Sequence, residues 1–309
     1  QAVCGITGLL IKREDLRPSL GAMMTPMFVC MAARGSDSGG MAVFDQPVVT
    51  PHRRLSLFAS DHQYDWSKLL DSLRRDFDAD SAGSAMQAVA NYASLSTSIE
   101  PARFKSWLAD AHPMVHLVSA GRCMSIYKDM GEPEEIADRY EFERMGGSHC
   151  VGHTRMATES DVTPVHSHPF SAGEDFCLVH NGSLSNPYML RRLLETQGLV
   201  FETDNDTEAA CRFIEWRLRC GDSLEDALGE CFERLDGFYT LLMATSDTFT
   251  LVRDAFACKP AVVAETDDYV AISSEYRSLT HLPGISNANL FEPHPEEIYS
   301  WQVNMPAPN

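Results

Sequence analysis

Near the start of the chain, Cys4 precedes a glycine at the head of the apolar stretch CGITGLLI. A cysteine attacks an amide carbon only as a thiolate, so a base must accept its proton. The α-amine of an N-terminal residue is a suitable base, because its reference pKa of about 7.7–8.0 lies close to neutral pH. Cys4 is therefore a candidate nucleophile. The alternative is a small side chain that packs within a buried strand.

Four further residues have types and positions that suit the same chemistry. Asn181 and Gly182 end the apolar stretch FCLVHNG, where an amide side chain and a glycine N–H can hold the oxyanion formed on amide attack. Arg155 ends HCVGHTR and can hold a carboxylate through two hydrogen bonds, while Asp206 opens a predicted helix and can bind an ammonium group. Their ordinary alternatives are an Asn-Gly turn, a surface ion pair and a helix N-cap. Together with Cys4 they describe a pocket for glutamine, a free amino acid whose side-chain amide is cleaved.

Six short motifs, in order along the chain, resemble the motif series of class II glutamine amidotransferases, a family of N-terminal-nucleophile hydrolases. They are CGI (4–6), RGSDSGG (34–40), GHTRMAT (152–158), SHPF (167–170), HNG (180–182) and NDTE (205–208). The resemblance implies an α+β fold, a four-layer αββα sandwich in which two antiparallel sheets are stacked between helical layers. It also implies that residues 1–309 form a single amidotransferase domain.

The resemblance implies a role for each of the five residues named above. Cys4 is the nucleophile, its own amine is the base, and the intermediate is a γ-glutamyl thioester. Asn181 and Gly182 form the oxyanion hole. Arg155 binds the carboxylate of glutamine, and Asp206 binds its ammonium group.

The resemblance places four further residues around this pocket. Thr158 and His168 would support it, and Arg34 and Asp37 would order the loop that covers it. One departure from the family pattern is Met156, which stands where many members carry an aromatic residue. No metal and no cofactor are expected in this chain.

Two longer stretches, GHTRMATES and CKPAVVAETDDYVAISSEYR, resemble one branch of the family in particular. That branch holds separate subunits similar to the glutamine domain of glutamate synthase, including the corresponding subunit of N-methylglutamate synthase. The resemblance implies that this chain delivers ammonia to partner synthase subunits, with a flavin-binding partner among them.

Three residues, Gln1, Ala2 and Val3, precede the candidate nucleophile. With these residues attached, the nitrogen of Cys4 is an amide and cannot serve as a base. The tripeptide is a propeptide removed during maturation, a retained segment on a scaffold that no longer hydrolyses glutamine, or an addition made for expression. The sequence leaves these three possibilities open.

The spacing of apolar residues predicts the elements that position the candidate site. Strands are expected over residues 4–11 and 39–44, with a methionine-rich helix over 18–35 between them. Further helices are expected at about 186–197, 206–220 and 223–235, followed by antiparallel strands. Strands near both ends with helices between them indicate α+β layers rather than a doubly wound sheet.

Residues 59–146 carry no motif that we can assign. They contain an exposed, charged helical pattern, a small polar stretch and a helix–strand–turn–strand pattern. We expect this segment to be an insertion that decorates the core and to be a candidate surface for docking of a partner subunit.

Composition excludes several classes of function. The formal net charge of −19 argues against binding to nucleic acid or to an anionic membrane. No apolar run approaches the roughly 20 residues that span a bilayer, and no signal peptide is recognisable. The nine cysteines contain no CxxC pair, which argues against a zinc site or a disulfide framework. A reduced, cytoplasmic protein is expected.

Two other functions remain as alternatives to glutamine hydrolysis. One is a non-catalytic assembly subunit, with an unprocessed N-terminus, whose pocket only binds glutamate or glutamine. The other is an N-terminal-nucleophile acylase or peptidase. The pair of Arg155 and Asp206 disfavours the latter, because these charges suit a free α-amino acid rather than the interior of a peptide.

Overall fold

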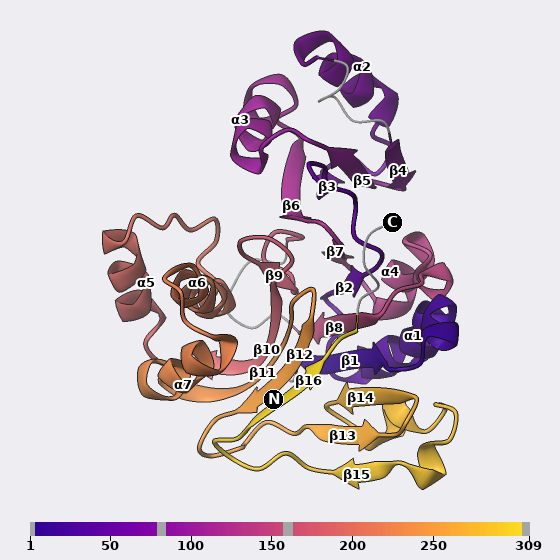
Figure 1. Ribbon diagram of the computed structural model, residues 1–309, viewed down its shortest axis with the longest axis vertical. Coiled ribbons are helices and arrows are strands. Elements are labelled where there is room, and N and C mark those ends of the chain that lie inside the picture. Colours follow the sequence, from indigo (N-terminus) through magenta and orange to yellow (C-terminus); the bar gives the residue numbers. More distant parts are fainter. Residues whose placement is uncertain (1–3, 79–84, 157–162, 305–309) are drawn as a thin grey trace.

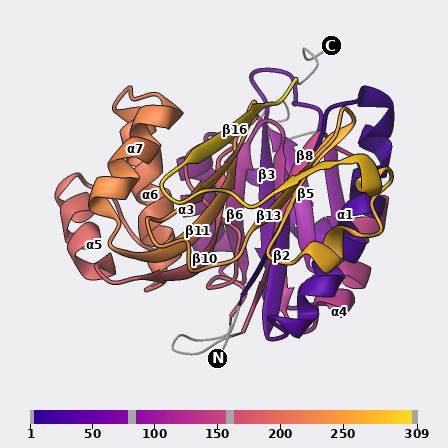
Figure 2. The same cartoon turned by 90° about the horizontal axis from the view of Figure 1, so that it is seen from below.

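The computed structural model describes residues 4–78, 85–156 and 163–304. Two antiparallel sheets are stacked face to face, and helices cover the outer face of each (Figures 1 and 2). The seven-stranded sheet has the order β15 (Asn289–Phe291), β13 (Val262–Glu265), β14 (Tyr269–Ser273), β1 (Gly5–Ile11), β8 (His149–Arg155), β2 (Ser38–Phe44) and β7 (Met124–Met130). The five-stranded sheet has the order β16 (Ile298–Gln302), β12 (Thr248–Arg253), β11 (Gly237–Ala244), β10 (Cys177–Leu184) and β9 (Phe170–Ser171).

The inner faces of the two sheets form one apolar layer, with Ile6 and Val151 from the first sheet and Val179 and Leu242 from the second. The sheets approach closely because Gly8 lacks a side chain. A Cβ atom at that position would lie 2.6 Å from Cδ2 of Leu242. This close approach brings β8 and β10, which carry Arg155 and Asn181, close to β1, which Cys4 directly precedes.

Helices pack on both outer faces because their apolar sides complete two further cores. The seven-stranded sheet is covered by α1 (Leu20–Cys30) and α4 (Pro133–Arg139), and the five-stranded sheet by α5 (Pro187–Thr196), α6 (Asp206–Arg219) and α7 (Leu224–Arg234) (Figure 2). The methionines of α1 are buried against β1, as their helical spacing predicted. The predicted helix over 18–35 is shorter than expected, because 3₁₀ turns at Glu14–Ser19 and Met31–Ala33 flank it.

Residues 53–121 build a third sheet beside the sandwich, at the top of Figure 1. Its order is β4 (Ala85–Val89), β5 (Tyr92–Thr97), β3 (Arg53–Ala59) and β6 (Val115–Gly121), and it has its own core with α2 (Trp66–Asp76) and α3 (Pro101–Ala111). These limits differ from the expected 59–146, because β7 pairs with β2 in the main sheet and α4 packs against α1. Whether the segment is an insertion stays a prediction.

The remaining short turns are 3₁₀ helices at Phe142–Arg144, Tyr276–Leu279 and Ile285–Asn287. Within the described ranges, no helix is both long enough and apolar enough to cross a bilayer.

Candidate active site

The side chain of Cys4 is directed between the two sheets. Residues two apart on a strand share a face, and Ile6 and Leu10 belong to the inter-sheet core, so Cys4 continues that face just before β1 begins. The residue is half-buried. Burial raises the pKa of its thiol, although a hydrogen bond from the backbone N–H of Met156 and the charge of Arg155 act in the opposite direction. A half-buried thiol that accepts an N–H is therefore present at the predicted position.

Asn181 lies next to Cys4 although the two belong to different sheets. Cys177 and Val179 of β10 face the inter-sheet core, and the two-residue period puts Asn181 on the same face. Its Nδ2 donates a hydrogen bond to the carbonyl oxygen of Cys4 over 3.1 Å. An amide nitrogen carries two N–H donors, so one remains for a ligand. The alternative of an Asn-Gly turn is wrong, because both residues lie within a strand.

Gly182 is required by the backbone that surrounds it. Its φ angle is +155°, and a Cβ atom would lie only 1.8 Å from the carbonyl oxygen of Phe238 on β11. A side chain would therefore separate β10 from β11 at this point. The glycine keeps the backbone next to Asn181 closely packed.

Arg155 closes β8 on the same face of the sheet as Val151, which belongs to the inter-sheet core. It is 7% exposed, so the alternative of a surface ion pair is wrong. The ladder pairs Gly5 with Thr154 and Ser38 with Arg155, so β1 and β2 both begin at the edge where β8 ends. Cys4 and the guanidinium therefore lie at one edge of the sheet.

Arg34 and Asp37 bridge the segments around the nucleophile. Arg34 donates from Nε to the carbonyl oxygen of Cys4 over 3.0 Å and from Nη1 to Oε1 of Glu275 over 2.9 Å. The backbone N–H of Asp37 donates to the carbonyl oxygen of Arg155 over 3.0 Å. The loop between α1 and β2 is thus tied to both β1 and β8.

Asp206 is the first residue of α6, and the N-cap is its neighbour Asn205, whose side chain accepts the N–H of Thr207. One carboxylate oxygen of Asp206 accepts the backbone N–H of Leu184 at 2.9 Å, which ties α6 to the end of β10. Burial alone would raise its pKa, but the neighbouring His180 and these hydrogen bonds lower the pKa of Asp206 to about 2. The group is a carboxylate at neutral pH.

His168 belongs to a cluster of three histidines behind Asp206. Its ring stacks on that of His153 at 4.0 Å between centroids, and its Nδ1 accepts the backbone N–H of His180. The hydroxyl of Thr207 lies within hydrogen-bond distance of the rings of His168 and His180. Burial lowers the pKa of His153 to about 3 and that of His168 well below its usual value, so both rings are neutral.

Comparisons with known proteins bear on the family to which the chain belongs. A family model described as a glutamine amidotransferase domain matches residues 153–281. The glutamine amidotransferase-like protein GlxB of Rhizobium meliloti is 41% identical over 302 residues, which cover 97% of this chain and 98% of the relative. A putative glutamine amidotransferase of Methanothermobacter thermautotrophicus is 31% identical over 312 residues, which cover 96% and 99%.

The chain belongs to the glutamine amidotransferase family. The solved glutamine phosphoribosylpyrophosphate amidotransferase of B. subtilis matches 98% of the chain with a TM-score of 0.59 and 17% identity. This amidotransferase spans 50% of the length of that enzyme's chain. The match confirms the predicted α+β fold of stacked antiparallel sheets between helical layers.

The amidotransferase site contains residues that sequence reasoning did not assign. Lys259 is one of the cations that act on the thiol of Cys4. Ser274 accepts the N–H of Ile6 at 2.9 Å, and Glu275 holds Arg34. All three residues stand in the stretch CKPAVVAETDDYVAISSEYR. That stretch resembles one branch of the family, but the resemblance assigned no role to any single residue in it.

The predicted role of Thr158 and the state of the N-terminal tripeptide stay predictions. Thr158 falls outside the described residues, as do Gln1, Ala2 and Val3.

Within residues 4–78, 85–156 and 163–304, no group of three His, Cys, Asp or Glu side chains is placed to hold a metal ion.

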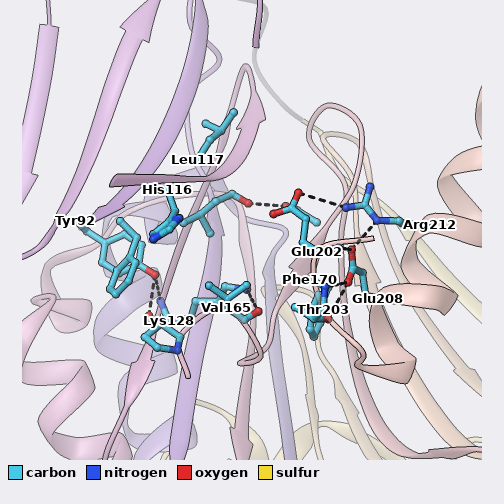
Figure 3. A pocket seen from close by; sticks show the side chains of 14 residues that line it. Tyr92, His116, Leu117, Lys128, Val165, Phe170, Glu202, Thr203, Glu208 and Arg212 are labelled. Carbon is cyan, nitrogen blue, oxygen red and sulfur yellow. Dashed lines mark hydrogen bonds and ion pairs between the residues drawn. The ribbon is translucent and has the colours of Figure 1, made fainter. Parts of the chain in front are cut away.

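A cavity of about 330 Å³ in the amidotransferase lies between the third sheet, β9 and α6, and Figure 3 shows the side chains around it. At its base, Nζ of Lys128 donates to the carbonyl oxygens of Ser167 at 2.9 Å and Pro169 at 3.3 Å, on either side of His168. On the opposite wall, Arg212 pairs with Glu208 at 2.7 Å. The cavity therefore abuts the elements that hold the histidine cluster and the start of α6.

Proposed function

We propose that this amidotransferase hydrolyses L-glutamine to glutamate and ammonia through a γ-glutamyl thioester on Cys4. The observation that carries the proposal is the hydrogen bond between Asn181 and Cys4, which joins a candidate oxyanion donor to a candidate nucleophile across the two sheets. The lowered pKa of Asp206 and the buried guanidinium of Arg155 support a pocket for both charged ends of an α-amino acid.

In the proposed reaction the thiolate of Cys4 attacks the carboxamide carbon of glutamine. The thiol proton passes to the α-amine of Cys4, a C–S bond forms, and the C–N bond breaks as the leaving nitrogen takes that proton and departs as ammonia. The second N–H of Asn181 and the N–H of Gly182 stabilise the oxyanion. Water then cleaves the thioester and releases glutamate.

The remaining predicted residues hold or support the substrate in this proposal. Arg155 binds the α-carboxylate and Asp206 the α-ammonium group, through charge-assisted hydrogen bonds. His168 supports Asp206 by way of Thr207. Thr158 is proposed to support the pocket, as the resemblance to the family motif implies.

The mechanism requires cleavage of the Val3–Cys4 bond, because only then does Cys4 carry an amine. The test compares protein that begins at Cys4 with protein that retains Gln1–Val3. We expect glutamine-dependent release of ammonia and glutamate only from the former. Equal release from both forms would remove the α-amine from the mechanism.

Delivery of the ammonia to a partner synthase is the second part of the proposal. It rests on the resemblance to stand-alone subunits of the glutamate synthase and N-methylglutamate synthase type. It is also supported by an exposed aromatic pair beside Gly182, formed by Phe238 and Phe256, whose ring centroids lie 5.5 Å apart. Purification of the untagged complex from native cells, followed by an assay of glutamine-dependent amination, tests this part. A chain that purifies alone from those cells would contradict it.

One observation favours a second candidate function, a non-catalytic subunit that binds an amino acid. Burial raises the pKa of the Cys4 thiol, which favours the unreactive protonated form. Tight binding of glutamine without any hydrolysis by protein that begins at Cys4 would support this function.

A further inference from the structure

Lys259 lies in the loop between β12 and β13, and two hydrogen bonds to its carbonyl oxygen fix its backbone. Thr240 donates from Oγ1 at 3.1 Å, and Arg253 donates from Nη2 at 2.9 Å. Thr240 lies directly opposite Asn181 in the ladder between β10 and β11. The loop is therefore held at the part of the sheet that carries the candidate oxyanion donor.

The buried side chain of Arg253 makes this position rigid. Its guanidinium donates to the carbonyl oxygens of Pro293, Ala257 and Lys259 and so fixes the backbone of the loop. A lysine on a clamped backbone samples less space than one on a mobile loop, so its charge stays near the site.

Among the residues that the structure describes, the cations that act on the Cys4 thiol come from three elements. Arg34 and Arg155 belong to the α1–β2 loop and to β8, and Lys259 belongs to the β12–β13 loop. Glu275, a carboxylate that contacts this group, is bound by Arg34 at 2.9 Å and by Arg277 at 2.6 Å.

Lys259 differs from the two arginines because its side chain has no partner among residues 4–78, 85–156 and 163–304. Its ammonium makes no ion pair and no hydrogen bond with any residue that the structure describes, in a chain with 44 acidic and 25 basic residues. The guanidinium of Arg34, by contrast, is shared between a carbonyl and a carboxylate. The charge of Lys259 is thus available to the sulfur.

We infer that Lys259 is a positioning residue for the nucleophile, whose ammonium stabilises the thiolate of Cys4 and so offsets part of the cost of burying that charge. The lysine forms no covalent bond and takes no proton; it stabilises the anion left when the thiol proton departs to a base. The use of this thiolate in catalysis rests on the proposed function, whereas the charge effect itself does not depend on it.

The test measures the rate at which iodoacetamide alkylates Cys4 as a function of pH, read by mass spectrometry on the peptide that contains it. The reagent is neutral, so its rate follows the thiolate fraction. Lys259→Met is compared with Lys259→Arg, which keeps the charge, and with Lys68→Met, which removes an exposed lysine from α2. Exposed Cys220 is the internal reference, and buried Cys150 reports loss of folding.

For Lys259→Met we expect the alkylation midpoint of Cys4 to rise by about half to one pH unit, so that its rate at neutral pH falls about 3- to 10-fold. Lys259→Arg and Lys68→Met should match the unsubstituted protein. An unchanged midpoint in Lys259→Met would overturn the inference. Should Cys150 become reactive in that variant, Lys259→Gln takes its place and is judged by the same midpoint. Alkylation needs no glutamine, so a failure to hydrolyse glutamine would refute the proposed function alone.

Discussion

Asn181 donates a hydrogen bond from Nδ2 to the carbonyl oxygen of Cys4 over 3.1 Å, across 177 positions of the sequence. The bond joins the start of β1 in one sheet to β10 in the other. It places an amide donor in direct contact with the backbone of the candidate nucleophile. Substitution of Asn181 is therefore expected to lower kcat much more than it changes KM.

Asn181→Ala should lower kcat for glutamine hydrolysis by about 10²- to 10³-fold, because one oxyanion donor is lost in the transition state. KM should change little, since the donor contributes little to ground-state binding. Steady-state kinetics of ammonia release measure both values. An unchanged kcat would exclude Asn181 from the oxyanion hole.

Gly182→Ala should destabilise the fold by about 3 kcal/mol, because the new Cβ would lie 1.8 Å from the carbonyl oxygen of Phe238. Urea unfolding followed by circular dichroism measures the change. The matched control is Gly229→Ala on α7, where a Cβ meets nothing within 4 Å. In the control a gain of roughly 0.5–1 kcal/mol is expected from the helix. Equal stability of the two variants would refute the packing argument.

Asp206→Asn should raise KM for glutamine by about 10- to 100-fold, because the substrate ammonium loses a charged hydrogen-bond partner. The kcat at saturating glutamine should fall much less. Glu208→Gln on the same helix removes a carboxylate that accepts the N–H groups of Glu202 and Thr203. A rise in KM of similar size in that control would show that Asp206 acts only through the fold.

The same carboxylate predicts a pH dependence of stability. The pKa of Asp206 is about 2 in the folded state, below its usual value of 3.8, so the unfolded state binds more protons between these values. Its contribution of about 2 kcal/mol is present above pH 4 and is lost as the pH falls towards 2. The difference in unfolding free energy between the unsubstituted protein and Asp206→Asn should therefore narrow over that window. A constant difference would contradict the lowered pKa.

Lys128 should make the protein more stable at alkaline pH. Burial lowers the pKa of its ammonium to about 8 from the usual 10.5, so the unfolded state binds more protons between these values. The free energy of unfolding, relative to that of Lys128→Met, should rise by up to about 3 kcal/mol from pH 8 to 10.5. Lys105→Met is the control, because Lys105 lies exposed on α3 and pairs with Glu202 at 2.5 Å. If the difference in unfolding free energy between the unsubstituted protein and Lys128→Met did not change with pH, the lowered pKa of Lys128 would be contradicted.

The sequence predicted the elements that carry the site because their patterns are local. Apolar runs located β1 and β2, and the stretches that end in Arg155 and Asn181-Gly182 form β8 and β10. The two-residue period of these strands then explains why Cys4, Arg155 and Asn181 face the space between the sheets. Buried strands of this kind can be predicted from the local sequence alone, without information on the residues that they contact.

The features that sequence reasoning missed depend on contacts between distant segments. The charge of Lys259 acts on the Cys4 thiol, and hydrogen bonds from Thr240 and Arg253 hold the backbone of its loop. No local sequence pattern encodes those long-range hydrogen bonds. The third sheet was likewise not foreseen, since β4 and β5 are short and join the sheet through β3, which lies far from them in the sequence. Asn205, not Asp206, proved to be the N-cap, because Asp206 is held instead by Leu184.

The most direct test of the central claim is to trap the covalent intermediate. Protein that begins at Cys4 is mixed with L-glutamine, quenched in acid within one turnover, digested and examined by mass spectrometry. We expect the peptide that contains Cys4 to carry a γ-glutamyl group, which is absent when D-glutamine replaces L-glutamine. Cys4→Ala should give neither the adduct nor ammonia. Glutamine hydrolysis that persists in Cys4→Ala would contradict the account.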